Sequence, residues 1–302
     1  MSFLWFLSRF RNPVTNGIFQ FFTLFGEELL VVGLVCVLFW CLDKKMAIRI
    51  GLSYFVAGLL VQMLKIIFCI PRPWILDSRF QPVASAVGTA TGYSFPSGHS
   101  QGAASLWGVL GQKLSGKSVK AVCFLIVFLT GFSRMFLGVH TPKDVAVGLL
   151  LGLASAVFVC CDEMERFVER HQGIVCFIFG LISLGLFAFA AYRIRFSGVE
   201  TAEGLDCCKA AGAGFGFAVG WYLEERYVAW NPEEVFKGRG KRDRAAVFFG
   251  GLAVTLLLKI CLKPLMGGTI AGDGARYAIL VLWIVVLYPA LVRNVRKKDR
   301  KK

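Results

Sequence analysis

The chain has few of the features on which soluble enzymes and secreted domains depend. Only 18% of its 302 residues are charged and only three are histidine. Its ten cysteines lack paired spacing, so we expect no disulfide framework and no zinc site. Only Cys207 and Cys208, in an expected external loop, leave room for oxidation. The N-terminus has no basic start and no small-residue cleavage site after an apolar core, so we expect no secretory signal.

What the chain has in excess is apolar surface. It is 56% hydrophobic with a mean hydropathy of +0.64, too apolar for an ordinary soluble domain of this length. The net charge of +15 is typical of nucleic-acid binding, but the basic residues fall between apolar runs and at the C-terminus. That distribution is typical of cytoplasmic loops, so we expect an all-α, multi-pass membrane protein that contacts membrane lipids and no nucleic acid.

The apolar runs predict a helical bundle of about nine transmembrane helices. A span needs about 20 residues, and the candidate runs are 27–42, 46–68, 99–113, 119–137, 142–161, 172–192, 208–228, 245–263 and 276–293. The run at 99–113 is short and rich in Gly, Ala and Ser, which favours packing against other helices. Residues 1–26 are interpreted as an amphipathic interfacial helix, with a frayed first span as the alternative.

The loop charges predict the orientation. Most of the 34 Lys and Arg residues fall in one set of alternate loops and in the tail, so the C-terminus is expected to be cytoplasmic and the N-terminus outside. Three polar segments then fall at the outer face, on a protein expected in the cell membrane. Because an ionisable side chain at membrane depth is costly without a partner or a wet cavity, such a cluster indicates a functional site.

The first polar segment, KIIFCIPRP, places Lys65 seven positions before Arg72. That spacing is close to two helical turns, so both side chains would project to one side if the helix persisted. A Lys supplies a mobile point charge and an Arg a planar fork, which together suit a phosphate. The alternative is that both side chains extend to the lipid headgroups. The loop from Cys69 to Gly98 is either a lid over the site or an ordinary external loop.

The second segment, YSFPSGHSQGAA, places Ser97 and Gly98 immediately before a helix whose first residues include His99. Unpaired backbone N–H groups at a helix N-terminus bind anions, glycine allows close approach, and the Ser97 hydroxyl adds a donor. His99 at this place is suited to protonate an oxygen leaving phosphorus. The alternative is a structural histidine, as a lone histidine usually is.

The third segment, GFSRMFLGVHTPKDVAVG, carries Arg134, His140 and Asp144. If a helix starts at Thr141 or Pro142, Asp144 lies one turn below His140 and can hold one ring nitrogen, which leaves the other free and basic. That arrangement fits a nucleophilic histidine that forms a phosphohistidine. The alternative is a helix cap beside an arginine that pairs with headgroups.

Together the three segments resemble the type 2 phosphatidic acid phosphatase family of lipid phosphate phosphatases. The family pattern is met in full by Lys65, Arg72 and Pro73, by Pro96, Ser97, Gly98 and His99, and by Ser133, Arg134, His140 and Asp144. The resemblance covers about residues 27–161, which we predict to be the catalytic helical core. It implies that His140 is the nucleophile, that Asp144 orients it and that His99 protonates the leaving group.

The resemblance also implies how the phosphate is held. Lys65, Arg72 and Arg134, with Ser97 and the Gly98 amide, would stabilise the equatorial oxygens in the transition state. We expect no metal and no other cofactor, because three cations offset the phosphate charge and the chain has no carboxylate cluster to hold Mg²⁺. The implied activity is metal-independent hydrolysis of a lipid phosphomonoester or diphosphate.

Two other functions remain open at this stage. In a lipid phosphotransferase the phosphohistidine would pass to another lipid in place of water. In a lipid transporter or scaffold the anion site would bind without turnover, although binding alone needs neither an acid nor a nucleophile.

Residues 162–302 form an additional helical region with a basic cytoplasmic tail and no chemical motif. Its AAGAGFGFAVG stretch at 210–220 favours either tight helix packing or dimerisation, and in the second case the protein would be a homo-oligomer. Glu224 and Glu225 are interpreted as solvated residues at the inner boundary.

Overall fold

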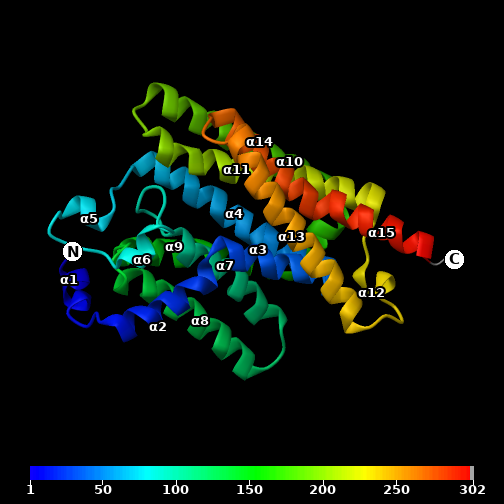
Figure 1. The fold of residues 1–302 in the computed structure, drawn as a ribbon, viewed down its shortest axis with the longest axis horizontal. Coiled ribbons are helices and arrows are strands. Elements are labelled where there is room, and N and C mark those ends of the chain that lie inside the picture. Colours follow the sequence, from blue (N-terminus) through cyan, green and yellow to red (C-terminus); the bar gives the residue numbers. More distant parts are fainter. Residues whose placement is uncertain (300–302) are drawn as a thin grey trace. The chain divides into compact units, whose positions relative to one another are not determined.

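The structure, a computed structural model, describes residues 1–299; positions 300–302 of the predicted basic tail lie outside the described residues. Within residues 1–299 the secondary structure is entirely helical (Figure 1). In chain order the elements are α1 (Ser2–Ser8), α2 (Pro13–Thr23), η1 (Leu24–Gly26), α3 (Glu28–Val37), η2 (Leu38–Leu42), α4 (Lys44–Phe68), α5 (Pro73–Leu76), α6 (Ala84–Val87), α7 (Gly98–Lys113), α8 (Lys117–Phe136), α9 (Pro142–Cys160), α10 (Asp162–Phe196), α11 (Thr201–Leu223), η3 (Glu224–Val228), α12 (Pro232–Val235), α13 (Lys241–Met266), α14 (Ile270–Leu282), η4 (Trp283–Leu287) and α15 (Tyr288–Asp299).

Six of the described helices are long and apolar enough to cross a membrane, or seven if a bent pair counts as one span. They support a multi-pass membrane protein, but the predicted number of nine is not confirmed. The run at 99–113 became α7, which has only 16 residues, and α11 is not among the six. The bent pair, Pro13–Gly26 with Glu28–Leu42, turns by 49°.

The N-terminal segment forms two helices where one interfacial helix was predicted. The first, α1, ends at Ser8, and α2 begins at Pro13. The break follows from the local sequence: Asn12 caps α2 through a capping box with Thr15, and Pro13 occupies the first turn. The stretch between the candidate runs 142–161 and 172–192 is helical as well, because α10 continues through His171 with only a non-helical kink.

The chain forms two compact units, and neither is one continuous stretch. The first contains Met1–Val32, Arg49–Glu165 and Arg193–Asp206, and the second contains Gly33–Ile48, Arg166–Tyr192 and the rest from Cys207. In the first unit, α7 packs against both α8 and α9, and α2 runs beside α8 (Figure 1). The three polar segments of the sequence all belong to this unit.

Small residues allow α7 and α9 to pack at very short range. A Cβ added to Gly148 would collide with the carbonyl oxygen of Ser97, and one added to Gly152 would lie 2.6 Å from the Cβ of Ala104. On the facing helix, a Cβ at Gly108 would lie 2.9 Å from the Cβ of Ala156. This close contact agrees with the prediction that the 99–113 helix is packed inside the bundle, and it brings the N-terminal ends of α7 and α9 together.

In the second unit the glycine-rich stretch of α11 packs within the chain. Added Cβ atoms at Gly212 and Gly216 would collide with the backbone of Gly274 and Ala278 in α14, and one at Gly220 would lie 3.3 Å from the Cβ of Val285. Of the two interpretations made from the sequence, the structure supports tight helix packing for this stripe. The residues that would serve a dimer through small side chains are already in contact with α14 and η4.

Two further expectations for the second unit were wrong. Glu224 is fully buried, and its carboxylate accepts hydrogen bonds from Lys44 Nζ at 2.9 Å and from the Trp230 backbone N–H at 2.6 Å. An unpaired carboxylate would be costly there, so this cluster explains how an acidic residue is tolerated inside the protein. Cys207 and Cys208 are also buried, within α11 and not in an external loop.

Candidate active site

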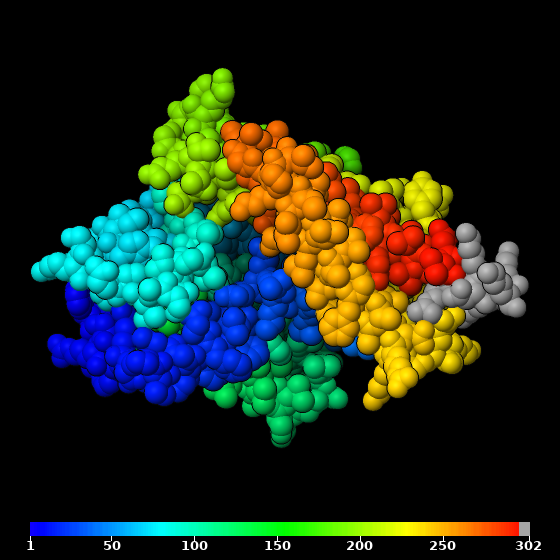
Figure 2. All heavy atoms as spheres, in the orientation of Figure 1, coloured from blue at the N-terminus to red at the C-terminus, as the bar shows by residue number. Residues whose placement is uncertain are grey.

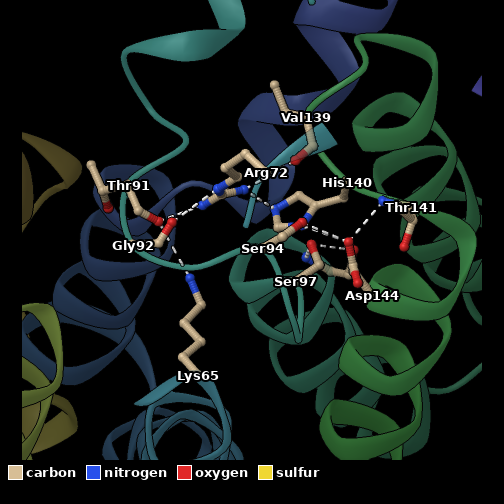
Figure 3. Close-up of polar contacts among 11 residues, drawn as sticks. Lys65, Arg72, Thr91, Gly92, Ser94, Ser97, Val139, His140, Thr141 and Asp144 are labelled. Carbon is tan, nitrogen blue, oxygen red and sulfur yellow. Dashed lines mark hydrogen bonds and ion pairs between the residues drawn. The ribbon is translucent and has the colours of Figure 1, made fainter. Parts of the chain in front are cut away.

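The end of α4, the beginning of α7 and the connection from α8 to α9 meet in the first unit. Figure 3 shows Arg72 and His140 pointing toward each other, with Lys65 extending from α4 toward the loop at Thr91 and Gly92. Arg134 and Asp144 are completely buried, and Lys65 and Arg72 are only 6% and 4% exposed. The structure therefore concentrates the charged residues that sequence analysis selected.

A backbone loop, and not helical spacing, brings Lys65 and Arg72 together. Helix α4 ends at Phe68, and Cys69 takes a left-handed conformation with φ of 48°, so the helix does not persist to Arg72 as the sequence argument assumed. The carbonyl oxygen of Thr91 accepts hydrogen bonds from both Lys65 Nζ and Arg72 Nη2. Arg72 also donates to the carbonyl oxygens of Gly92 at 2.9 Å and Val139 at 3.1 Å. These bonds fix the guanidinium plane.

The histidine at 140 lies between this guanidinium and Asp144. Arg72 Nη1 lies 2.9 Å from His140 Nε2, and because a guanidinium only donates, Nε2 is the acceptor and the ring proton is on Nδ1. Nδ1 lies 3.8 Å from Asp144 Oδ2. The carboxylate is therefore close to the expected ring nitrogen but beyond hydrogen-bond distance, and Nε2 faces a donor where the sequence argument expected it to be free.

Asp144 is held away from the ring by its place in the helix. Its Oδ2 accepts hydrogen bonds from the Thr141 backbone N–H at 2.8 Å and from Ser94 Oγ at 2.7 Å (Figure 3). The first bond belongs to the capping box that starts α9, so the cap that was the alternative interpretation of Asp144 exists alongside its position next to His140. Catalytic hydrogen bonds are often long in a protein without substrate.

Arg134 and His99 have polar atoms that the protein itself leaves unsatisfied. Arg134 Nη1 donates to Thr23 Oγ1 at 2.7 Å, whereas its Nε and Nη2 have no partner among the described residues. The buried Nε2 of His99 has none there either. Burial, and then the nearby positive charges of Arg134, Lys65 and Arg72, lower the pKa of His99 well below its usual value. Since buried polar groups in proteins are normally hydrogen-bonded, these atoms indicate a site for a polar ligand.

Ser97 and Gly98 form the start of α7 as expected. The Ser97 hydroxyl accepts a hydrogen bond from Ser100 Oγ at 2.9 Å and caps the helix, while its backbone N–H donates to the Asp144 carbonyl at 2.9 Å. Its own hydroxyl hydrogen stays available to donate. Within the described chain, no atom lies within 4 Å of a Cβ added to Gly98, so the backbone is accessible to a ligand at this point.

Local electrostatics keep His140 uncharged. Burial, and then the positive charges of Arg72, Arg134 and Lys65, lower the pKa of His140 well below its usual value near 6.5, and a contact with the Ser94 backbone opposes this shift. A neutral imidazole has a lone pair on Nε2 at neutral pH, which a nucleophile requires. In the described part of the chain, no group of three or more His, Cys, Asp or Glu side chains is arranged to hold a metal ion.

Several residues at this site were missed by sequence reasoning. Thr23 supports Arg134, and Ser94 supports Asp144. Glu203 and Asp206, in the first turns of α11, act electrostatically on both Lys65 and Arg72. Only Ser94 gave a local signal, because it lies beside the Pro-Ser-Gly-His segment; the others come from distant parts of the chain.

The loop that carries Arg72 and Ser94 is held by the N-terminal segment. Trp5 Nε1 donates to Asp77 Oδ2 at 3.2 Å, and Arg11 donates to the carbonyl oxygens of Phe136 and Gln81, each at 2.7 Å. The space-filling view shows the N-terminal residues in dark blue directly against this loop in cyan (Figure 2). The loop is therefore held by Trp5 of α1 and by Arg11, which also binds the end of α8.

Comparison with known families matches two parts of the chain. Residues 46–167 match the PAP2 superfamily, and residues 208–300 match the PAP2 superfamily phosphatase transmembrane extension. The first match contains every residue of the three polar segments. The second accounts for most of the region to which the sequence analysis assigned no chemical motif.

Curated relatives are similar over part of their length. The chain is 29% identical to an undecaprenyl-diphosphatase of Sulfolobus acidocaldarius and 32% identical to phosphatidylglycerophosphatase B of Bacillus subtilis, over 45% and 33% of this chain. It spans 65% and 52% of the lengths of these two relatives. The crystal structure of Aquifex aeolicus LpxE is 29% identical, with a TM-score of 0.46 over 52% of this chain and 91% of that chain.

Proposed function

We propose that this protein hydrolyses a lipid phosphate, because residues 46–167 match the PAP2 superfamily and residues 208–300 match the transmembrane extension of its phosphatases. The observation that carries the proposal is the arrangement around His140: Nε2 faces Arg72 at 2.9 Å, and the unpartnered N–H groups of Arg134 lie in the same buried cluster. A tetrahedral anion is the ligand that satisfies these donors and brings phosphorus to the imidazole.

In the first step, His140 Nε2 attacks phosphorus and the bond to the lipid oxygen breaks. The negative charge of the bound phosphate offsets the surrounding cations and favours protonated His99, which gives its proton to that oxygen. The lipid then leaves as an alcohol, or as a monophosphate if the substrate is a diphosphate. Asp144 stabilises the positive ring through the Nδ1 proton. In the second step water attacks the phosphohistidine, His99 accepts its proton, and phosphate is released.

The cations act on the charge that develops during transfer. Arg72 leaves His140 Nε2 when phosphate arrives and then, with Arg134 and Lys65, donates to the equatorial oxygens, while Ser97 and the Gly98 N–H complete the cradle. Three fixed positive charges offset the charge of the phosphate, so we propose that the reaction needs no metal ion. We also propose that it occurs at the extracytoplasmic face, with the C-terminus in the cytoplasm, because the loop charges support that orientation.

A chelator-containing assay tests this proposal directly. Purified protein in detergent is offered phosphatidic acid, its lyso form, a sphingoid phosphate and a polyprenyl diphosphate, with EDTA present, and released phosphate is measured. We expect release from at least one lipid and none from His140→Ala. The matched control is His171→Ala, because His171 lies in the kink of α10, outside the site. Phosphate release by the purified His140→Ala protein at the wild-type rate contradicts the mechanism.

The two rival functions differ from hydrolysis in measurable ways. A phosphotransferase yields a new phosphorylated lipid when an acceptor lipid is supplied, whereas hydrolysis yields inorganic phosphate with or without it. A transporter or scaffold would still move a labelled lipid phosphate after His140 is replaced by alanine. The side of the membrane is tested with right-side-out vesicles and an impermeant short-chain substrate, which should be hydrolysed without opening the vesicles.

A further inference from the structure

Two acidic residues that the mechanism does not use converge on Lys65. Glu203 and Asp206 are three positions apart in α11 and therefore share a face. A Cβ built on Gly92 would lie 3.3 Å from Lys65 Nζ, 3.4 Å from Asp206 Oδ2 and 3.7 Å from Glu203 Oε2. Gly92 has a positive φ of 70° and no side chain, so the ammonium and both carboxylates meet at one point of the loop.

Exposure places these acids at the outer edge of the site. Arg134 is 0% and His140 1% exposed, Lys65 is 6% exposed, and both acidic residues are partly exposed. We call Glu203 and Asp206 the acidic rim. A group attached to the phosphate and extending past Lys65 toward the surface meets this pair of carboxylates.

The acidic rim also has a hydrogen-bond acceptor that the protein does not use. Glu203 Oε2 is buried and has no hydrogen-bond partner in the described part of the chain. Leaving a buried carboxylate oxygen unpaired costs free energy, and a donor on a ligand would recover it. The unused acceptor and the negative charge of the two carboxylates favour a positively charged donor at this position.

We propose that the acidic rim selects substrates by the charge of the group next to the phosphate. It favours a lipid phosphomonoester that carries an ammonium group close to the phosphate, and it disfavours a diphosphate, whose second phosphoryl group would face two carboxylates. This specificity rests on the proposed lipid phosphatase function of the same site.

The expected size follows from simple electrostatics. At an effective dielectric constant of about 20, two unit charges about 6 Å apart interact strongly enough to change an equilibrium roughly 100-fold. Water at the partly exposed rim screens part of this interaction. We therefore expect about a tenfold change in preference when one of the interacting charges is removed.

A matched substrate pair isolates the effect in kinetics. A sphingoid base 1-phosphate and its N-acetyl derivative differ in the ammonium group and keep the same phosphate. Wild-type protein should prefer the ammonium form about tenfold in kcat/KM, mainly through KM, and Glu203→Gln with Asp206→Asn should reduce the ratio to near 1. The single Glu203→Gln variant should give an intermediate ratio. Glu200→Gln is the control, because Glu200 is exposed and precedes α11.

The ratio of kcat/KM for the ammonium substrate to that for the N-acetyl substrate separates a role in specificity from a structural role. If the acids only hold Lys65 in place, both substrates lose rate together and the ratio stays at the wild-type value, which would overturn the proposal. If wild-type protein releases phosphate from no lipid, the phosphatase proposal fails by itself.

A binding measurement decides the specificity even in that case. Thermal stability of the detergent-purified protein is measured against inorganic phosphate and methylenebisphosphonate, which cannot be hydrolysed. The double variant should bind methylenebisphosphonate about tenfold more tightly relative to phosphate than wild type does, and Glu200→Gln should not. An unchanged relative affinity contradicts the acidic rim.

Discussion

Replacing Gly148 with alanine should disable the site without unfolding the protein. Gly148 lies one turn after Asp144 in α9 and contributes no side chain to the site. An added Cβ collides with the Ser97 carbonyl oxygen and lies 3.3 Å from the Ser100 Cβ. The obstacle is backbone, which cannot rotate away, so α9 and the start of α7 must separate.

The size of the effect can be worked from this contact. Nonbonded carbon atoms are at their best about 3.5–4.0 Å apart, so relief requires a shift of roughly 1 Å between the segment holding His99 and the helix holding Asp144. A misplacement of about 1 Å can cost about 100-fold in rate. Overpacking costs about 1–3 kcal/mol, and replacing a helical glycine by alanine returns about 1 kcal/mol. We therefore expect kcat to fall about 100-fold with a net loss of stability of only about 0–2 kcal/mol.

The assay compares phosphate release with thermal unfolding for three variants. Gly185→Ala is the control, since no atom of the described chain lies within 4 Å of its added Cβ, and it should keep wild-type activity. Gly152→Ala meets Ala104 one turn farther from the site, so it should lose similar stability and less activity. If Gly148→Ala retains more than about a third of wild-type kcat, the contact between α7 and α9 does not set the catalytic geometry.

Three further predictions concern the charged residues. Asp144→Asn should lower kcat by about 10³–10⁴-fold with little change in KM, as expected when a histidine loses its carboxylate partner; equal loss in KM would point to a binding role. Arg134→Lys keeps the charge but loses the planar fork, so kcat/KM should fall about 10–100-fold, and wild-type kinetics would exclude bidentate contact. The pKa of His140 is lowered by burial and by Arg72. The acidic limb of the kcat/KM profile should therefore lie below pH 6.5 and move upward in Arg72→Gln, where the opposing charge is gone; an unmoved limb for the same substrate contradicts this cause.

The sequence motifs identified the residues that meet at the site because each motif combines local spacing with a chemical role. The expected membrane side alone is enough to group Lys65, Arg134 and His140, because ionisable residues at membrane depth need a partner. For Lys65 and Arg72 the structure shows a cause other than helical spacing. The two side chains meet through a loop after α4 ends, because Pro71 and Pro73 do not allow the helix to continue.

Long-range partners could not be predicted in this way. Thr23 reaches Arg134 across 111 positions of the chain, and nothing in its neighbourhood distinguishes it from other threonines. The acidic rim depends on how α11 returns to Gly92, which hydrophobic periodicity does not specify. The number of nine spans is not confirmed for a related reason. The run that forms α7 is apolar by composition, yet its small residues serve helix contacts, and window hydropathy does not separate these two uses.

The anchoring of Asp77 by Trp5 and of Gln81 and Phe136 by Arg11 has a practical consequence for experiments on this protein. Removing the first eleven residues, or crowding them with a fusion partner, would release the segment that presents Arg72. Kinetic constants from such a shortened or tagged version would then describe a loosened loop while every reacting side chain was still present. Purification handles are better placed away from this end.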